Sequence, residues 1–232
     1  MTLIIYFRCS DGHVLISDRQ ASDPSGSSRE DTKTFISMPK DFAIGGSGTG
    51  FDVVWIFGRL TRDSNVNGNN IVEKLNELLE IYRESFSDAR VMIDAILVTR
   101  EKTRFVPYEI VIRGDQFYVN PITVRYRCCG LKPAKILASY ILKKKKLDEV
   151  PWTEAVHYAI ATMKEVSTEI DGVGRLEEFG FDVTVMLDNG SIHVLRDYRD
   201  DNSKVAFDLE TLEAISCRFN EITESSSGGR DT

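Results

Sequence analysis

The order in which strand-like and helix-like segments follow one another constrains the fold of this chain most. Segments rich in β-branched and aromatic residues predict a β-hairpin over 3–20 and two short strands over 32–46. Apolar residues at helical spacing then predict one helix that begins after Thr49 and a second over 71–85. The later segments repeat this order, with strands over 92–100, 105–113, 116–120 and 122–129, helices over 133–146 and 153–170, and a final hairpin over 181–198.

Turn-forming residues mark where neighbouring strands reverse. Asp11-Gly12 separates the first two strands and Asn189-Gly190 separates the last two, and both dipeptides are typical of two-residue hairpin turns. The Pro, Gly and Ser content of 23–31 predicts a polar loop. The chain is therefore expected to build antiparallel sheets from hairpins.

This alternation predicts an α+β protein. Strands, two helices, strands, two helices and strands suit a four-layer αββα sandwich, in which two antiparallel sheets stack face to face between two helix pairs. A chain of 232 residues is long enough to bury one large core without disulfides or metals. We therefore expect a single domain over 1–222, followed by a flexible tail over 223–232 that is rich in Ser, Gly and charged residues.

Composition argues against several classes of partner. The formal net charge of -7 disfavours a surface for nucleic acid or for an anionic membrane. No apolar run approaches the roughly 20 residues that a membrane helix needs, and the first residues lack the pattern of a signal peptide. We therefore expect a cytoplasmic protein with no nucleic-acid and no membrane partner.

The cysteines and histidines do not indicate a metal site. The four cysteines show no CxxC spacing, so we expect reduced thiols. His13, His157 and His193 lie far apart in the sequence and show no ligand spacing. The sequence therefore predicts neither a metal nor a cofactor.

Thr2 carries the first sign of chemistry. A small second residue is what removal of the initiator methionine requires, so we expect Met1 to be lost and the mature chain to begin at Thr2. A terminal threonine holds a hydroxyl nucleophile and a free amine in one residue. The ordinary pKa of an α-amino group, roughly 7.7–8.0, lets that amine accept the hydroxyl proton near neutral pH.

Two charged residues strengthen this interpretation. Asp18 and Arg19 end the second predicted strand, which an antiparallel hairpin returns to the start of the first strand, beside Thr2. Lys33 begins the next predicted strand, and a lysine near Thr2 would lower the pKa of its hydroxyl and amine if Asp18 compensated the buried charge. The three residues together predict a nucleophilic site.

These residues resemble the proteasome β-type subunits of the N-terminal-nucleophile hydrolase superfamily. The resemblance rests on Thr2, on DGHVLISDRQAS with Asp18-Arg19, on Lys33 in KTFISM, on IGGSGTG before a helix, and on GFDVTVMLDNG with Asp182. It extends over most of the chain and implies the αββα sandwich of that superfamily.

The resemblance also implies roles for individual residues. Thr2 is the nucleophile that forms an acyl-enzyme, Asp18 orients Lys33, and Lys33 lowers the pKa of the threonine. A backbone N–H of Gly46 or of a neighbour such as Ser47 stabilises the oxyanion. Arg19 and Asp171 are supporting residues. The GGSGTG segment lacks the Lys-Ser/Thr pair of a phosphate-binding loop.

Three positions depart from the family pattern. Leu131 and Gly174 stand where the family carries serines near the threonine, and Leu3 follows the nucleophile where the family prefers a small or hydroxylic residue. The expected residues for nucleophilic attack are present while their surroundings are altered.

The implied function is a threonine-type endopeptidase that cleaves polypeptides, with a homo-oligomeric ring as its expected assembly. Two alternatives stay open. A transpeptidase or protein ligase would pass the same acyl-enzyme to another amine, and a catalytically silent scaffold subunit would keep the fold alone.

Overall fold

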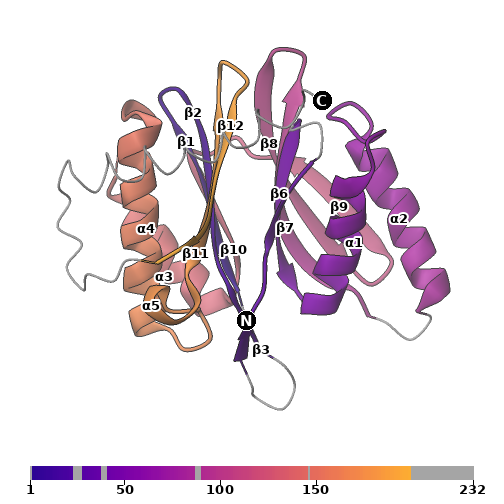
Figure 1. Cartoon of the computed structure of the whole chain (residues 1–232), viewed down its shortest axis with the longest axis horizontal. Coiled ribbons are helices and arrows are strands. Elements are labelled where there is room, and N and C mark those ends of the chain that lie inside the picture. Colours follow the sequence, from indigo (N-terminus) through magenta and orange to yellow (C-terminus); the bar gives the residue numbers. More distant parts are fainter. Residues whose placement is uncertain (1, 23–27, 38–40, 87–89, 146, 200–232) are drawn as a thin grey trace, which may run out of the picture.

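Two five-stranded antiparallel sheets lie side by side at the centre of the molecule (Figure 1). The computed structural model describes residues 2–22, 28–37, 41–86, 90–145 and 147–199. In spatial order, the first sheet contains β10 (Tyr126–Gly130), β1 (Leu3–Cys9), β2 (Gly12–Asp18), β11 (Phe181–Leu187) and β12 (Ile192–Tyr198). The second contains β5 (Thr34–Ile36), β6 (Phe42–Gly48), β7 (Met92–Glu101), β8 (Arg104–Arg113) and β9 (Gln116–Pro121).

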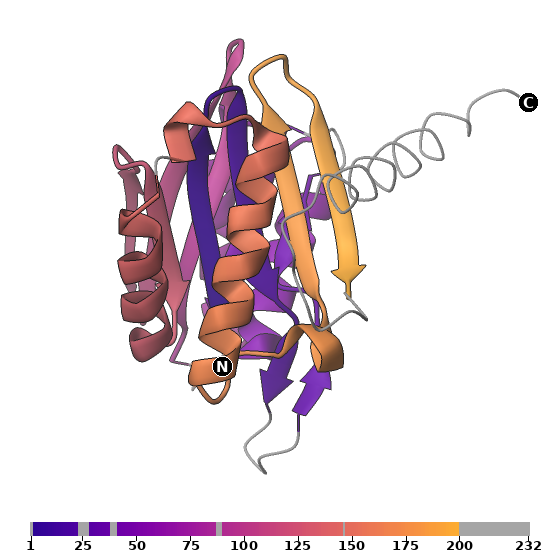
Figure 2. The ribbon, with the colours of Figure 1, turned by 90° about the vertical axis from the view of Figure 1, so that its left-hand side faces the viewer.

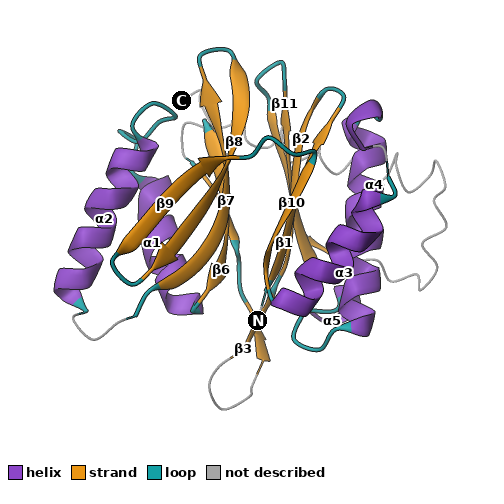
Figure 3. Cartoon of the chain, turned by 180° about the vertical axis from the view of Figure 1, so that it is seen from behind, coloured by secondary structure: helices purple, strands orange, loops and turns teal. Residues whose placement is uncertain are grey.

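Helices cover the outer face of each sheet. Figure 3 shows α3 and α4 against the first sheet and α1 and α2 against the second, and Figure 2 shows the first pair from its outer side. The four long helices are α1 (Gly50–Arg62), α2 (Ile71–Ser85), α3 (Lys132–Lys143) and α4 (Trp152–Glu169). The described residues also form two short helices, the 3₁₀ helix η1 (Leu147–Glu149) and α5 (Leu176–Phe179).

A third, two-stranded sheet corrects the predicted architecture. The described residues form three antiparallel sheets and five α-helices, so the prediction of a four-layer αββα sandwich built from two sheets is wrong. The extra sheet pairs β3 (Gln20–Ser22) with β4 (Ser28–Glu30), within and beside the segment predicted as a polar loop. Arg29 and Glu30 are exposed, so this hairpin lacks the apolar alternation that marks a strand in the sequence.

Strand β2 shows why the first sheet is buried on both faces. All seven of its residues are buried. Val14 and Ile16 belong to the core on the helix side of the sheet, where β2 packs against α4, while Leu15 between them packs into the layer between the two large sheets. The strand therefore links two cores, which explains its nearly unbroken apolar sequence.

The turn between β1 and β2 differs by one residue from its prediction. Cys9 pairs with Gly12, so Ser10 and Asp11 form the turn and Gly12 belongs to the strand. A Cβ on Gly12 would lie 2.5 Å from the carbonyl oxygen of Met186 on β11. The glycine is needed here for the close approach of a neighbouring strand.

Antiparallel pairing brings three chain segments to one end of the molecule. Ile4 pairs with Ser17 and Phe181 pairs with Asp18, so β1 begins where β2 ends and β11 begins. Thr2 therefore lies beside Asp18. The predicted tail over 223–232 lies outside the described residues, and the single domain over 1–222 stays a prediction.

Candidate active site

Thr2 is held in a fixed position just before β1. Only 6% of the residue is exposed. Its carbonyl oxygen accepts a hydrogen bond of 2.9 Å from the amide of Leu131. The neighbouring Gly130 has φ +117°, and a Cβ there would collide with the same carbonyl oxygen. The end of β10 therefore fixes the backbone from which the Thr2 side chain projects.

Asp18 organises the site from the end of β2. Its carboxylate is fully buried and accepts four hydrogen bonds, which is the stabilisation a buried charge requires. The donors are the amides of Leu3 at 2.7 Å, Gln20 at 3.2 Å and Gly174 at 3.2 Å, and the Lys33 ammonium at 2.9 Å. Because Leu3 directly follows Thr2, the same carboxylate that binds Lys33 also holds the backbone of the candidate nucleophile.

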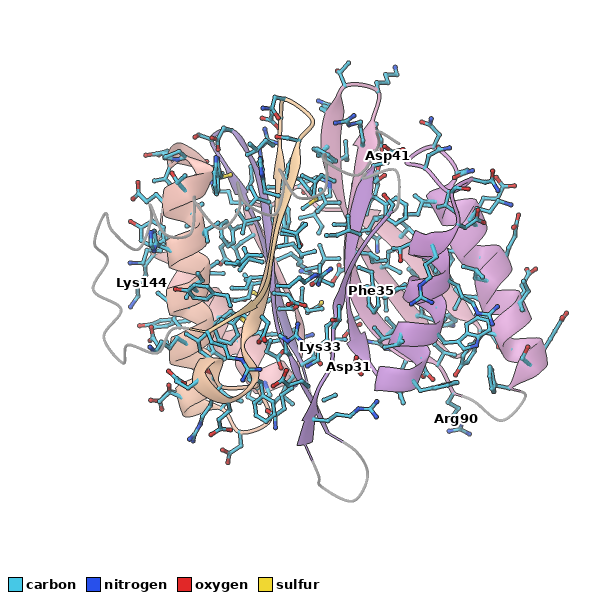
Figure 4. All side chains as sticks on the ribbon, in the orientation of Figure 1. Asp31, Lys33, Phe35, Asp41, Arg90 and Lys144 are labelled. Atoms are coloured by element: carbon cyan, nitrogen blue, oxygen red, sulfur yellow. The ribbon has the colours of Figure 1, made fainter. Side chains whose placement is uncertain are left out.

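Lys33 is a buried cation beside this carboxylate. It is 6% exposed and forms an ion pair with Asp18, and its ammonium also donates to the carbonyl oxygen of Gln20. A buried ammonium is tolerated where a carboxylate and further hydrogen bonds replace its water. Figure 4 shows Lys33 and Asp31 at the end of the two large sheets where Figure 1, in the same orientation, marks the N-terminus.

Thr2 and Lys33 open onto one pocket of about 230 Å³. Its walls come from the start of α1 and from the segment between β4 and β5. Val53 and Val54 of α1 supply apolar surface, while Asp31 supplies a carboxylate. The pocket is concave and largely apolar with a few convergent polar groups, as small-molecule and peptide sites usually are.

The glycine-rich end of β6 forms another wall of the pocket. Gly46 and Gly48 line it, while Ser47 between them pairs with Asp94 of β7. The Gly46 amide donates a hydrogen bond of 2.9 Å to the Lys33 carbonyl oxygen. A Cβ on Gly46 would collide with the Phe57 ring, so glycine allows α1 to pack against this strand.

Arg19 lies in a separate ion-pair network behind Asp18. Its guanidinium donates to the fully buried Asp182 carboxylate at 2.9 Å, and Arg196 donates to the other oxygen of Asp182 at 2.8 Å. Arg19 thus ties the end of β2 to β11 and β12. This contact supports a structural role beside the site.

Gly174, and not the predicted supporting residue Asp171, contacts Asp18. Asp171 is exposed in the turn after α4. Gly174, three residues later, is buried and donates its amide to Asp18. A Cβ on Gly174 would lie 2.7 Å from the Gln20 Cβ. The sequence analysis named Gly174 only as a departure from the family pattern and missed its contact with Asp18, because a backbone amide carries no side-chain signal. The two glycines in DGVGR were the available sign of a close approach.

The described residues outside this site form no metal-binding cluster. No group of three or more His, Cys, Asp or Glu residues there is arranged to hold a metal ion. Cys9, Cys128 and Cys129 are buried free thiols, and Cys217 lies outside the described residues. No helix among the described elements is long and apolar enough to cross a membrane.

Comparisons with known proteins identify structural neighbours only. No protein-family model and no curated protein matches the chain. Anbu from Hyphomicrobium sp. strain MC1 matches with a TM-score of 0.67 at 14% identity, covering 99% of this chain and 98% of that one. A helical assembly of the Anbu complex from Pseudomonas aeruginosa matches with a TM-score of 0.67 at 14% identity, covering 96% of both chains. Anbu from Yersinia bercovieri, described as an ancestral β-subunit, matches with a TM-score of 0.66 at 15% identity, covering 99% and 98%.

These neighbours correct the family assignment. The chain shares a proteasome-like fold with Anbu proteins, and identities of 14–15% show a shared fold alone. The assignment to the proteasome β-type subunits is therefore wrong, because these structural neighbours are Anbu proteins.

Proposed function

We propose that the chain is a threonine-type hydrolase that cleaves peptide bonds through an acyl-enzyme on Thr2. One observation carries the proposal: the Asp18 carboxylate binds both the Lys33 ammonium and the amide that follows Thr2, at the rim of a pocket that Thr2 and Lys33 line. This arrangement supports a nucleophile, a cation beside it and a concave space for substrate.

The first step needs a free amine on Thr2, so whatever precedes Thr2 must be removed. The Thr2 hydroxyl oxygen then attacks the carbonyl carbon of the scissile peptide bond, and the Thr2 amine takes the hydroxyl proton. The Lys33 ammonium, which lines the same pocket, favours the alkoxide-like transition state and a neutral amine by its charge. Asp18 compensates this charge and keeps Lys33 in place.

Gly48 is the better candidate for the oxyanion donor. The Gly46 amide already donates to Lys33, so it faces the β5 edge of β6. Amides two residues apart in a strand face the same edge, and Gly48 lies in the pocket beyond the first residue of β5. Its N–H is therefore suited to an anion that forms near Thr2; one such donor contributes roughly 2.7–4 kcal/mol in a known hydrolase.

Collapse of the tetrahedral intermediate breaks the peptide bond and forms an ester on Thr2. The leaving amine takes the proton that the Thr2 amine carries. Water then attacks the ester carbonyl carbon and gives one proton to the Thr2 amine. The amine passes this proton to the departing Thr2 oxygen, so the peptide acid is released and both the hydroxyl and the free amine of Thr2 are restored. Transfer to a second amine in place of water would give a ligase from the same ester.

Self-association is the second part of this proposal. The neighbour from Pseudomonas aeruginosa is a helical assembly, which supports assembly of this chain with itself. We expect light scattering of the purified chain to give a mass of at least twice the 26.2 kDa of one chain. A monomer at all concentrations would contradict it.

The intact mass of the protein, before and after incubation with a peptide epoxyketone, tests the mechanism. The hydroxyl and the free amine of one terminal residue both attack this electrophile, so an adduct reports both groups at once. We expect a chain that begins at Thr2 and takes up one adduct. Thr2→Ala should take up none, while Thr32→Ala, which changes another threonine of the same pocket, should keep the adduct.

Other outcomes separate the alternatives. A single adduct together with peptide cleavage supports hydrolysis, and product that increases with an added peptide amine supports transfer. A chain that begins at Thr2 but takes up no adduct would contradict the proposal and favour a silent scaffold. An adduct that persists in Thr2→Ala would contradict it by placing the nucleophile on another residue.

A further inference from the structure

A second pocket lies between the two large sheets at the end opposite Thr2. Its volume is about 500 Å³, and it shares no lining residue with the Thr2 pocket. Strands β1 and β2 supply Tyr6, Arg8 and His13, and the start of β8 supplies Arg104 and Phe105. Figure 1 shows the β1–β2 turn and the tip of β8 together at this end of the molecule.

Hydrogen bonding fixes the proton on His13. An Arg8 N–H lies 2.7 Å from His13 Nε2, and because a guanidinium only donates, Nε2 must accept. Burial lowers the pKa of His13 to about 3, so the ring is neutral at physiological pH. Its one proton therefore sits on Nδ1.

In this tautomer His13 cannot accept a hydrogen bond from the Tyr6 hydroxyl. The Tyr6 oxygen lies 2.9 Å from His13 Nδ1. Because Nδ1 already carries the ring's one proton, which the Phe105 backbone also attracts, Tyr6 cannot donate its own O–H to this nitrogen. Tyr6 is 1% exposed, and no acceptor for its own O–H is found among the described residues. A buried donor without an acceptor is costly, and its position in the lining of the pocket indicates that a ligand atom accepts it.

The charges of the pocket favour an anion. Arg8 pairs with Asp188 at 2.8 Å and Arg125 pairs with Asp148 at 3.0 Å. Arg104 lines the same pocket and forms no ion pair within the described part of the chain. Because His13 is neutral, the charged groups that line the pocket are the three arginines and the two aspartates named above. Their sum is a net charge of one positive unit.

Apolar surface adjoins this charge. Pro107 and Ile122 line the pocket, as does Val124, which is 56% exposed, an unusual exposure for a large apolar side chain within a concave site. A ligand that covered Val124 would remove this surface from water.

We propose that this second pocket binds an organic anion, with its carboxylate or phosphate between the Tyr6 hydroxyl and Arg104 and its apolar body against Phe105, Pro107 and Val124. The site is independent of the Thr2 chemistry. It uses the neutral His13 as a fixed hydrogen-bond donor that aims the Tyr6 O–H at the anion.

Calorimetric titration of the full chain with phenylacetate tests the site. We expect saturable binding of phenylacetate and no binding of its neutral analogue phenylacetamide. Tyr6→Phe removes only the hydroxyl and should weaken binding by about tenfold, the usual effect of losing a hydrogen bond to a charged group. Arg104→Gln should weaken it similarly and, being exposed, leaves the core intact.

Controls make the result decisive. Arg62→Gln changes an exposed arginine of α1 away from the pocket and should leave the affinity unchanged. Absence of saturable phenylacetate binding, equal binding of phenylacetamide, or unchanged affinity in both Tyr6→Phe and Arg104→Gln would overturn the proposal. Inorganic phosphate that bound as tightly as phenylacetate would overturn the role of the apolar wall.

Discussion

At the scale of single residues, His13 should make stability depend on pH. Burial and the neighbouring Arg8 lower its pKa from 6.5 to about 3, and a hydrogen bond with the Phe105 backbone opposes them. The unfolded histidine titrates near 6.5, so below that pH the unfolded chain binds a proton that the folded chain does not. Stability is therefore complete above pH 6.5 and falls as pH drops toward 3, by up to about 1.4 kcal/mol per pH unit.

Urea unfolding at pH 7.0, 6.0 and 5.0 checks this effect. The wild type should lose unfolding free energy between pH 6.5 and 5. We expect His13→Gln to reduce this loss by the contribution of one bound proton, up to about 1.4 kcal/mol per pH unit. His193→Gln keeps His13 and should keep the wild-type slope. An identical slope in wild type and His13→Gln would show that His13 is not the titrating group.

The buried pair of Asp18 and Lys33 should couple strongly. Asp18→Asn leaves the Lys33 ammonium without a counter-charge at a site where both side chains are buried, so we expect the unfolding free energy to fall by about 3–5 kcal/mol. Lys33→Met should cost less, because three backbone amides still bind the carboxylate. The double variant should lose less than the sum of the two, and simple additivity in denaturant unfolding would count against the pair.

At the scale of elements, the junction of β10 and α3 should tolerate no side chain at Gly130. Its φ of +117° is unfavourable for alanine, and the added Cβ would strike the Thr2 carbonyl oxygen. Gly114 is the matched control, since its φ is +58° and no atom lies within 4 Å of an added Cβ. We expect Gly114→Ala to cost about 1 kcal/mol and Gly130→Ala at least twice that, measured by urea unfolding.

Activity separates the two glycines further. Because Gly130 sets the backbone that carries Thr2, Gly130→Ala should also slow capture of the epoxyketone, whereas Gly114→Ala should not. Equal losses of stability in the two variants would mean that the contact with Thr2 relaxes without cost.

The elements also show where sequence reasoning succeeds. The long helices and strands could be predicted because their apolar residues recur either at helical spacing or in the pattern of a strand. The segment 71–85, which forms α2, shows the helical spacing. The hairpin of β3 and β4 was missed because it is short and mostly polar, with Arg29 and Glu30 exposed, and α5 is too short to show a period. In the site, the family resemblance implied the pair of Asp18 and Lys33, whereas nothing in the sequence indicated that the amide of Gly174 contacts Asp18, since this contact depends on where a turn packs.

At the scale of the whole molecule, the two large sheets are joined by a shared apolar layer. Leu15 from the first sheet and Ile96 and Phe105 from the second belong to one buried cluster. The layer also lies between the Thr2 pocket at one end and the second pocket at the other. A molecule built this way should unfold as one unit, since neither sheet keeps its inner face buried without the other.

The two tryptophans of the chain test this cooperativity. Trp55 on α1 packs on Tyr82 at 5.1 Å between ring centroids, and Trp152 on α4 stacks on His193 at 5.8 Å. Each therefore reports on one sheet with its helices. In Trp55→Phe and Trp152→Phe, the remaining tryptophan should give a urea midpoint that coincides with the circular dichroism midpoint.

Leu15→Ala then perturbs the layer that both halves share. We expect it to lower the unfolding free energy by about 3 kcal/mol, and to shift the midpoints reported by Trp55 and Trp152 equally. Ile136→Ala, on an exposed face of α3, should change the free energy by less than about 0.5 kcal/mol. Trp152 belongs to the half of the molecule whose sheet contains Leu15. A midpoint shift confined to Trp152 would show that the two halves unfold separately and that the layer between them holds too little buried surface to couple them.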